Sequence, residues 1–409
     1  MRIIYLHQYF STPAMPGGTR SFEMARRLVA ADHEVYMITS DRVSNNSDDW
    51  YRTIEAGIQV HWLPVRYGNT MPYHERIKAF FRFATKAGLY ANRIRADVVF
   101  ATSTPLTITI PAVYAAKQQK IPMVFEVRDL WPELPIAVGA IKGPMIPPAR
   151  WLERFAYRHS KEIVALSPGM KEGIVQIGYP PERVHVIPNS CDLELFQVTA
   201  EAGVAFRNRF SWLGDRPLVI YAGTFGRING VGYLARLAAE ILSLAPEVRF
   251  LAVGGGYEYD MVSKLARDLG VLDRNFFMIP QLPKAEMPAL FSAATISTSM
   301  FIDLPQMWAN SANKFFDSLA AGKPVAINYK GWQANLLNQT GAGLVLPPND
   351  LLSAARLLVN AIKDQNWLTK AGKAALSVAR TRFNRDLLAR QLETVLVNAA
   401  SRGCTECID

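Results

Sequence analysis

The stretch that decides the fold is MRIIYLHQYFSTPAMPGGTRSFEMARRLVAADHEVYMITS, residues 1–40. Apolar runs at residues 3–9 and 34–39 flank a segment at residues 21–30 with helical spacing of its apolar side chains. A strand, a helix and a second strand in this order are typical of a parallel sheet covered by helices. These forty residues therefore predict the opening of a doubly wound α/β domain.

The same alternation continues along the chain and restarts once. Further apolar runs predict strands at residues 59–63, 98–101, 123–127, 163–165 and 184–187. A turn cluster at residues 188–192 and a polar stretch then precede a second series, at residues 218–222, 249–253, 276–279, 294–297, 324–327 and 343–346. A chain of 409 residues is also too long for one ordinary core.

We therefore expect two doubly wound Rossmann-like domains that face each other across a cleft. The predicted boundaries are residues 1–190 and residues 191–384. Within residues 385–409, apolar side chains at helical spacing predict a terminal helix that crosses back to the N-terminal domain.

The composition indicates the kind of partner that the protein binds and the cellular compartment in which it acts. The formal net charge of +10 indicates an anionic partner. The three cysteines, Cys191, Cys404 and Cys407, are an odd number without a second pair for zinc, which favours reduced thiols in the cytosol. The first residues read as a strand rather than a signal peptide, and no apolar run approaches the ~20 residues that a membrane span needs. We expect a cytoplasmic protein that does not cross a membrane.

Two glycine-containing loops are candidates for phosphate binding. One carries Gly17, Gly18 and Arg20 before the first helix, and the other carries Gly223, Gly226 and Arg227 after the first strand of the second domain. Glycine lets backbone approach a phosphate, and helix N-termini favour anions. Each loop alone could equally be a tight turn. Neither matches G-x-G-x-x-G, which counts against a nicotinamide or flavin enzyme, although Asp41 lies where such enzymes bind ribose.

Four blocks of the sequence resemble the family 4 glycosyltransferases of GT-B architecture over essentially the whole chain. The blocks are the first glycine loop with Arg20 and Glu23, VRDLWPE at residues 127–133, IPNSCD at residues 187–192 with Phe196, and NKFFDSLAAGKPV at residues 313–325. The DLWPE run resembles the subgroup that serves bacterial O-antigen, capsule and colanic acid synthesis.

The resemblance implies a donor site in the second domain. Asp317 occupies the position of the family carboxylate that binds the donor ribose, and two carboxylate oxygens suit vicinal hydroxyls. Ala309 stands where the family has a further Glu, so the sugar contact would pass to Asn310, Ser311 or Asn313.

The resemblance also assigns residues to the diphosphate and the base. Arg227 matches a family arginine on the diphosphate, and Asn229 stands near the position of the family lysine. We expect Lys314 to supply that charge, while a solvated neighbour of the site is the alternative. The base would lie against the backbone near Gln281.

The family mechanism is retaining and independent of metal, so we expect neither a metal nor a cofactor. Arg227 and Lys314 would stabilise the departing diphosphate. Among Glu126, Asp129 and Glu133, Asp129 is the candidate for the acceptor-side base. A structural ion-pair network of Arg128, Asp129 and Glu133 is the alternative.

The segment Arg66–Arg95 carries seven basic residues against Glu75, interleaved with aromatic and aliphatic side chains. This composition suits a helix at an anionic membrane surface, although packing of the aromatic residues in the core is the alternative. Pro147 and Pro148, before Arg150 and Trp151, could shape a second part of that face.

The predicted function is transfer of a sugar, for which an N-acetylated or deoxy sugar fits the subgroup, from a nucleotide diphosphate donor, UDP by family precedent. The predicted acceptor is a polyprenyl diphosphate-linked saccharide at the inner face of the cell membrane. The alternatives are a nucleotide-sugar 2-epimerase of the same fold and a non-catalytic peripheral membrane protein. A nucleic-acid-binding protein is disfavoured, because it would leave the paired loops and Asp317 unexplained.

Overall fold

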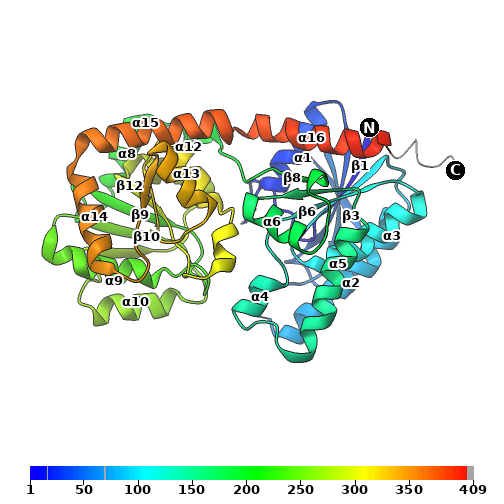
Figure 1. Cartoon of the computed structure of the whole chain (residues 1–409), viewed down its shortest axis with the longest axis horizontal. Helices are drawn as coiled ribbons and strands as arrows, with labels where there is room; N and C mark the ends of the chain where they lie inside the picture. The colour runs from blue at the N-terminus through cyan, green and yellow to red at the C-terminus, as the bar shows by residue number, and fades with distance from the viewer. Residues whose placement is uncertain (16, 69–70, 403–409) are drawn as a thin grey trace. The chain divides into compact units, whose positions relative to one another are not determined.

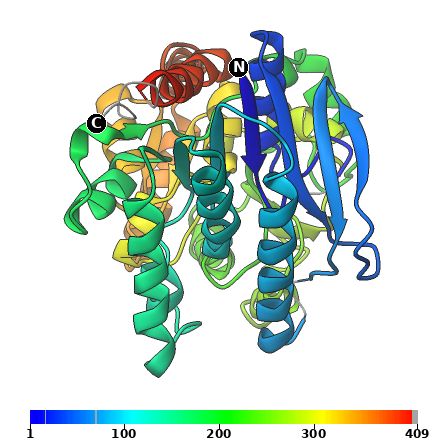
Figure 2. The same cartoon turned by 90° about the vertical axis from the view of Figure 1, so that its right-hand side faces the viewer.

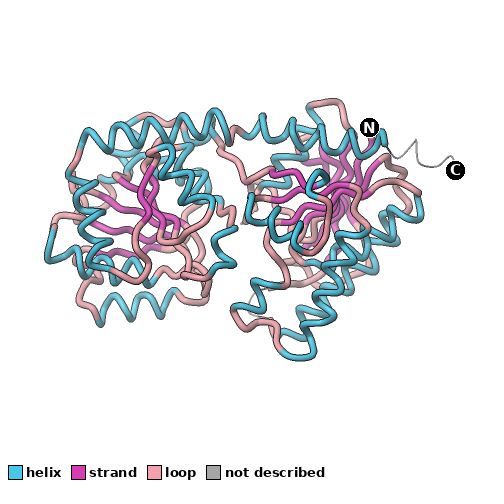
Figure 3. The backbone as a smooth tube through the Cα atoms, viewed as in Figure 1, coloured by secondary structure: helices cyan, strands magenta, loops and turns pink. Residues whose placement is uncertain are grey.

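The structure, a computed structural model, describes residues 1–15, 17–68 and 71–402. It divides into two compact units, one of residues Met1–Pro188 together with the described residues from Asp386 onward, and one of residues Asn189–Arg385. Each has its own sheet with helices around it (Figure 3). Cys404 and Cys407 lie outside the described residues, and the thiol of Cys191 is buried.

The first unit contains an eight-stranded sheet of order β3-β4-β2-β1-β5-β6-β7-β8. Only the edge strand β3 runs antiparallel to its neighbour, and β1, β2, β4 and β3 lie side by side at one end (Figure 2). The strands are β1 Arg2–Leu6, β2 Glu34–Asp41, β3 Tyr51–Glu55, β4 Ile58–Pro64, β5 Val98–Thr102, β6 Met123–Val127, β7 Glu162–Ala165 and β8 Val184–Val186. The sequence pattern missed β3, because an exposed edge strand carries too few apolar residues to show a period.

Helices cover both faces of this sheet. Helix α1 and the terminal helix α16 share a core with alternate residues of β1 and β2, including Tyr5, Leu28 and Leu392. Helices α2, α3 and α5 lie on the opposite side (Figure 1). The helices are α1 Arg20–Ala30, α2 Tyr73–Ala91, α3 Thr109–Gln119, α4 Glu133–Ala137, α5 Ile146–Arg158, α6 Pro168–Gln176 and α16 Arg385–Arg402.

The second unit contains a six-stranded parallel sheet of order β11-β10-β9-β12-β13-β14. Its inner strands are almost entirely buried, as expected for a parallel sheet covered on both faces, and the edge strands β11 and β14 are partly buried. They are β9 Leu218–Ala222, β10 Arg249–Val253, β11 Phe276–Ile279, β12 Ile296–Ser299, β13 Val325–Ile327 and β14 Gly343–Val345.

Helices α9, α10 and α14 share one core with this sheet, in which Tyr221, Leu237 and Leu358 are buried. The remaining helices include α12, which packs against α15. The helices are α7 Leu193–Phe196, α8 Ala200–Arg207, α9 Gly232–Leu244, α10 Tyr259–Asp268, α11 Met287–Ala293, α12 Asn313–Ala320, α13 Trp332–Thr340, α14 Leu351–Lys363 and α15 Gln365–Arg382. Across the described residues, no helix is both long enough and apolar enough to span a bilayer.

Candidate functional site

The strand order marks one ligand position in each sheet. In the second unit, β9 lies between β10 and β12, so the chain reverses its direction of winding at β9. In such sheets ligands bind beyond the carboxyl ends of the strands at this switch point. The loop after β9 carries Gly223 and Gly226, and the segment after β12 leads into α12. The donor residues predicted from the sequence therefore lie beyond the carboxyl ends of the strands of the second sheet.

Lys314 is a buried cation at this edge. Its side chain is 9% exposed, and its Nζ donates a 3.0 Å hydrogen bond to the hydroxyl of Tyr221. The ammonium lies over the rings of Tyr221 and Phe301, 4.5 and 4.8 Å from their centroids. No carboxylate of the described residues is within ion-pair distance of Nζ, and burial lowers the pKa of Lys314 to about 7. The protein thus holds a desolvated ammonium without an acid to neutralise it.

The glycine loop forms the wall beside this ammonium. A Cβ placed on Gly223 would lie 3.3 Å from the Tyr221 hydroxyl and 3.6 Å from Lys314 Nζ. The amide of Gly223 donates to the carbonyl of Val253, and the amide of Gly226 donates to Asn229 Oδ1. Both amides are therefore already hydrogen-bonded within the protein, and the contact of this loop with a phosphate stays a prediction. The missing side chain of Gly223 leaves room beside Lys314, whereas a Cβ on Gly226 would lie 3.0 Å from Asn229 Oδ1.

Asp317 lies one helical turn after Lys314 on α12 and is half-buried. Burial raises the pKa of Asp317 to about 7, against the smaller opposing effects of Arg385 and Lys284. Arg385 is itself held by Asp192, with 2.7 Å between Nη1 and Oδ2. The carboxyl group of Asp317 is thus within electrostatic reach of two cations, and one of them, Arg385, is already paired with Asp192.

Three residues are expected to contact the sugar in place of the Glu that the family has at the position of Ala309. They differ in whether their side chains are available to a ligand. The amide nitrogen of Asn310 donates to the carbonyl of Met307, and the Ser311 hydroxyl accepts from the backbone of Asn189. Asn313 is exposed at the first turn of α12, and no partner for its side chain occurs among the described residues. Asn313 is therefore the one of the three that is open to a ligand.

Arg227 and Gln281 are both exposed. The Arg227 guanidinium lies over the ring of Tyr257, 5.1 Å from its centroid. Gln281 follows β11, a few residues before Lys284, whose charge acts on Asp317. Asn229 uses its side chain to close the glycine loop, so it does not replace a phosphate-binding lysine.

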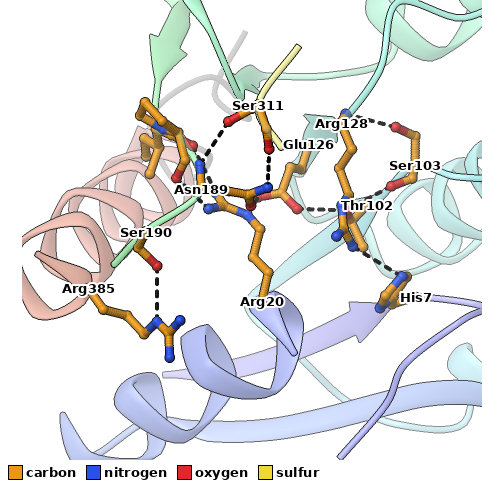
Figure 4. Close-up of polar contacts among 12 residues, drawn as sticks. His7, Arg20, Thr102, Ser103, Glu126, Arg128, Asn189, Ser190, Ser311 and Arg385 are labelled. Carbon is orange, nitrogen blue, oxygen red and sulfur yellow. Dashed lines mark hydrogen bonds and ion pairs between the residues drawn. The ribbon is translucent and has the colours of Figure 1, made fainter. Parts of the chain in front are cut away.

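In the first unit, Arg20 is a structural residue. Its Nε and Nη2 donate to Glu126 Oε1 at 3.0 and 2.8 Å, and further bonds reach the carbonyls of Ile187 and Pro188 (Figure 4). Both partners of this ion pair are buried, and Thr102 also donates to Glu126. Burial would raise the pKa of Glu126, but Arg20, Arg128 and these hydrogen bonds hold it below its usual value. This geometry corrects the expected phosphate contact of Arg20 and removes Glu126 from the candidate bases.

The carboxyl ends of β1, β5 and β6 bring other polar groups together. Arg128 donates its backbone amide to Ser103 Oγ, and its Nη1 lies 3.4 Å from His7 Nε2 (Figure 4). Burial, with the charges of Arg128 and Arg42, holds the pKa of His7 well below its usual value, so the ring is neutral at pH 7. Its buried Nδ1 has no hydrogen-bond partner among the described residues.

Asp129 lies in the same place, directly after β6 and Arg128. Burial raises the pKa of Asp129 to about 6, although Arg128 opposes this shift. Within the described part of the chain Asp129 forms no ion pair, whereas Glu133 pairs with Arg150 at 3.0 Å. The alternative of one ion-pair network through Arg128, Asp129 and Glu133 is therefore not what the structure shows.

Gly17 and Gly18 are exposed in the loop between β1 and α1. Gly17 has a φ of 130°, a region that favours glycine, and a Cβ there would lie 3.0 Å from Ser11 Oγ. The loop thus needs glycine for its own conformation, and its contact with a phosphate stays a prediction.

The predicted membrane segment Arg66–Arg95 contains α2, and most of its large side chains face the protein. Phe83 is fully buried, Phe80 packs on Tyr67, and Tyr90 stacks on Trp50. Arg82 and Lys86 both pair with Asp48. Phe81 and Leu89 are the large apolar residues of this helix that are clearly exposed among those described. The aromatic residues of α2 therefore serve mainly the core, as the alternative interpretation expected.

Sequence reasoning missed Tyr221, Phe301 and Lys284. The Lys314 ammonium lies over the rings of the first two, and the charge of the third acts on Asp317. Tyr221 is the next-to-last residue of β9, so its position before the glycine loop was a usable signal. Phe301 lies in a loop and Lys284 begins a short 3-10 helix, and neither position gave a signal in the sequence.

Two family models match the chain. The one described as "Glycosyl transferase 4-like domain" matches residues 17–190, and the one described as "Glycosyl transferases group 1" matches residues 205–378. The chain is also similar to WbjE of Pseudomonas aeruginosa, named as a glycosyltransferase, with 28% identity over 68% of each chain. WcaI of Escherichia coli, named for colanic acid biosynthesis, is 24% identical over 68% of this chain and 72% of its own length.

Solved structures share the fold. Sucrose-phosphate synthase of Thermosynechococcus elongatus has a TM-score of 0.79 at 17% identity, over 98% of this chain and 99% of that one. HepE of Anabaena, in complex with UDP and glucose, has a TM-score of 0.74 at 16% identity, over 97% and 100%. The two family matches lie on the two parallel-sheet domains and include most of the residues of the sequence blocks that carry the resemblance. The chain therefore belongs to the family 4 glycosyltransferases of GT-B fold.

Proposed function

We propose that this glycosyltransferase moves a sugar from a UDP-linked donor to a polyprenyl diphosphate-linked saccharide, with retention of configuration, in bacterial surface polysaccharide synthesis. The enzyme would act at the inner face of the cell membrane. The observation that carries the proposal is the uncompensated ammonium of Lys314, held beside the glycine loop and one turn from Asp317.

The diphosphate of the donor would bind at Lys314. A buried ammonium without an acid partner is costly, and a phosphate supplies the missing negative charge. Helix α12 begins here without a side-chain cap, so its first amides and its dipole also favour an anion. Arg227, which is exposed and already ordered by Tyr257, is placed in the same loop to add a second cation.

The donor ribose would bind at Asp317, whose two oxygens can accept from both hydroxyls. Asn313 would contact the sugar in place of the side chain absent at Ala309. The base would lie against the segment at Gln281, which precedes Lys284.

The transfer breaks the bond between the anomeric carbon and the diphosphate oxygen and forms a bond from the acceptor oxygen on the same face. Lys314 and Arg227 stabilise the charge that develops on the leaving diphosphate. Asp129 accepts the proton of the acceptor hydroxyl, for which a pKa of about 6 is suited near neutral pH. His7 Nδ1, buried and unpaired, is available to orient that hydroxyl.

Two similar proteins support parts of this proposal. The HepE structure contains UDP and glucose, and the name of WcaI places it in colanic acid biosynthesis. A nucleotide diphosphate donor and a surface saccharide acceptor are thus the expected substrates of this chain as well.

Calorimetry with UDP and GDP tests the donor site. We expect UDP to bind more tightly, and Asp317→Ala to weaken binding at least roughly tenfold with an unchanged fold. Asp268→Ala, an exposed carboxylate of α10 that pairs within its helix, is the matched control. Preferential GDP binding would reject the UDP assignment, and unchanged affinity in Asp317→Ala would remove Asp317 from the site. NMR of the anomeric centre in the product tests retention.

A further inference from the structure

We infer that the exposed face of α5 is the surface with which this protein docks on an anionic phospholipid membrane. This inference rests on the proposed function, because it supplies the contact through which a lipid-linked acceptor would be reached. It centres the membrane contact on α5, whose start at Pro147 and Pro148 the sequence suggested as a second part of the membrane face, rather than on α2.

The face of α5 carries two parallel rows of side chains. Arg150, Arg154 and Arg158 follow each other at intervals of four residues, and so do Trp151, Phe155 and His159. The ring centroids of Trp151 and Phe155 are 5.2 Å apart, and those of Phe155 and His159 are 4.3 Å apart. Together with Ile146 and Pro147, these six side chains line one continuous hollow.

Two of the three arginines lack an ion-pair partner among the described residues. Arg150 pairs with the exposed Glu133, but Arg154 and Arg158 have no ion pair among the described residues. Glu153 is buried on the other side of the helix, where it accepts a hydrogen bond from Tyr157. Like charges four residues apart destabilise a helix. An anionic partner would remove this repulsion.

A second hollow extends the positive charge beyond the end of α5. It shares Arg158 and His159 with the first hollow and adds Lys117 of α3, Lys120 directly after α3, and Arg183. Among the described residues, no acidic side chain lines either hollow. Two adjoining concave surfaces rich in Lys and Arg suit the phosphates of lipid headgroups, each cation contributing about 1 kcal/mol near an anionic surface.

The apolar residues at the start of α5 favour a membrane over a nucleic acid. Trp151 is 62% exposed and Met145, just before the helix, is 39% exposed. A lipid interface accepts tryptophan and aliphatic side chains in the acyl boundary while its headgroups bind arginine. The chain reaches α5 from the end of β6, where Asp129 lies. The docking surface therefore follows the candidate acceptor-binding segment in the sequence, with α4 between them.

Flotation with vesicles tests the inference. The wild-type protein should bind vesicles of phosphatidylcholine with phosphatidylglycerol and bind phosphatidylcholine alone much less. Arg154→Glu combined with Arg158→Glu should weaken binding more than roughly tenfold. The matched control is Arg82→Glu combined with Lys86→Glu on α2, which should retain most of the binding. Equal loss in both pairs, or full retention in the α5 pair, would overturn the assignment.

Two further measurements separate this inference from the proposed function. Brominated lipids should quench part of the tryptophan fluorescence of the wild-type protein, and Trp151→Phe should lose that part. UDP affinity, measured by calorimetry without vesicles, should be unchanged in the α5 variants, which also shows that they are folded. A protein that binds UDP but prefers duplex DNA to anionic vesicles would refute the membrane surface and leave the donor site intact.

Discussion

Arg20 in the first unit and Lys314 in the second are buried cations near the start of a helix, yet their surroundings differ. Arg20 is 5% exposed and is neutralised by Glu126 at 2.8 Å, with two backbone carbonyls completing its hydrogen bonds. Lys314 is 9% exposed and has a phenol hydroxyl and two aromatic rings, but no carboxylate among the described residues.

The difference separates a charge that holds the fold from a charge that is kept for a ligand. A buried ion pair with satisfied hydrogen bonds is a closed arrangement. A buried ammonium with a lowered pKa is a local cost to stability, of the kind found at functional sites. By the same criterion Arg20 is a structural residue, and Lys314 is the residue that we propose for the donor.

The largest effect is expected when the Arg20 pair is broken. Glu126→Ala leaves the Arg20 guanidinium buried and unpaired, which should lower the free energy of unfolding by about 3–5 kcal/mol in denaturant titration. Glu133→Ala is the control, because its exposed pair with Arg150 should contribute less than ~1 kcal/mol. A loss in Glu126→Ala as small as that of the control would contradict the structural role.

The second largest effect is expected on catalysis. The substitution at Lys314 should also stabilise the free protein, whereas Glu126→Ala should destabilise it. Lys314→Met should reduce kcat/KM by about 10²–10³-fold, since the charge on the leaving diphosphate loses its closest cation. The same change should raise the melting temperature of the free protein, because burial no longer opposes a charge.

Lys363→Met, an exposed lysine of α14, controls for the loss of a positive charge. This control substitution should change neither kcat/KM nor the melting temperature. A Lys314→Met protein that is destabilised and still fully active would show that the ammonium belongs to the fold, as Arg20 does.

The smallest effect is a dependence of donor affinity on pH. The pKa of Asp317 is raised to about 7, so the carboxylate that accepts ribose hydroxyls is lost as the pH falls. The contribution of Asp317 to UDP affinity should drop by about tenfold between pH 8 and pH 6. Lys314, with its pKa also at about 7, gains charge over this range and opposes that drop in the total affinity, so the contribution of Asp317 has to be isolated.

Asp317→Asn provides the comparison at each pH, which cancels the titration of UDP itself. The ratio of wild-type to Asn affinity should rise with pH. Because the native pKa lies above the unfolded value of 3.8, free wild-type protein loses stability as the pH rises from about 4 to 7, and Asn should abolish that loss. A constant ratio would refute the titration of Asp317.

Much of the fold could be predicted from sequence, because buried parallel strands are short apolar runs separated by helical periods. The pattern located β1, β2 and every strand of the second sheet within a few residues. It failed at β3, where Tyr51–Glu55 forms an exposed edge. It placed the aromatic residues of α2 in lipid, since composition alone does not show whether Phe83 faces inward.

In the candidate site, too, neighbours on one helix could be predicted from the sequence, whereas contacts between residues far apart in the sequence could not. Lys314 and Asp317 could be found because they share one helix, and spacing along a helix is visible in sequence. Arg20 could not be assigned correctly, because its partner Glu126 lies 106 residues away on another strand. The lowered pKa of Lys314 also depends on Tyr221 and Phe301, which come close only through the fold.

The return of α16 to the first unit has a consequence for biosynthesis. Leu388, Leu392 and Leu396 are buried against strands that the ribosome makes nearly four hundred residues earlier. A nascent chain therefore carries an uncovered apolar surface on its N-terminal domain through almost the whole of translation. Release of a prematurely terminated chain would leave that surface exposed to chaperones and proteases, so only full-length synthesis produces a closed domain.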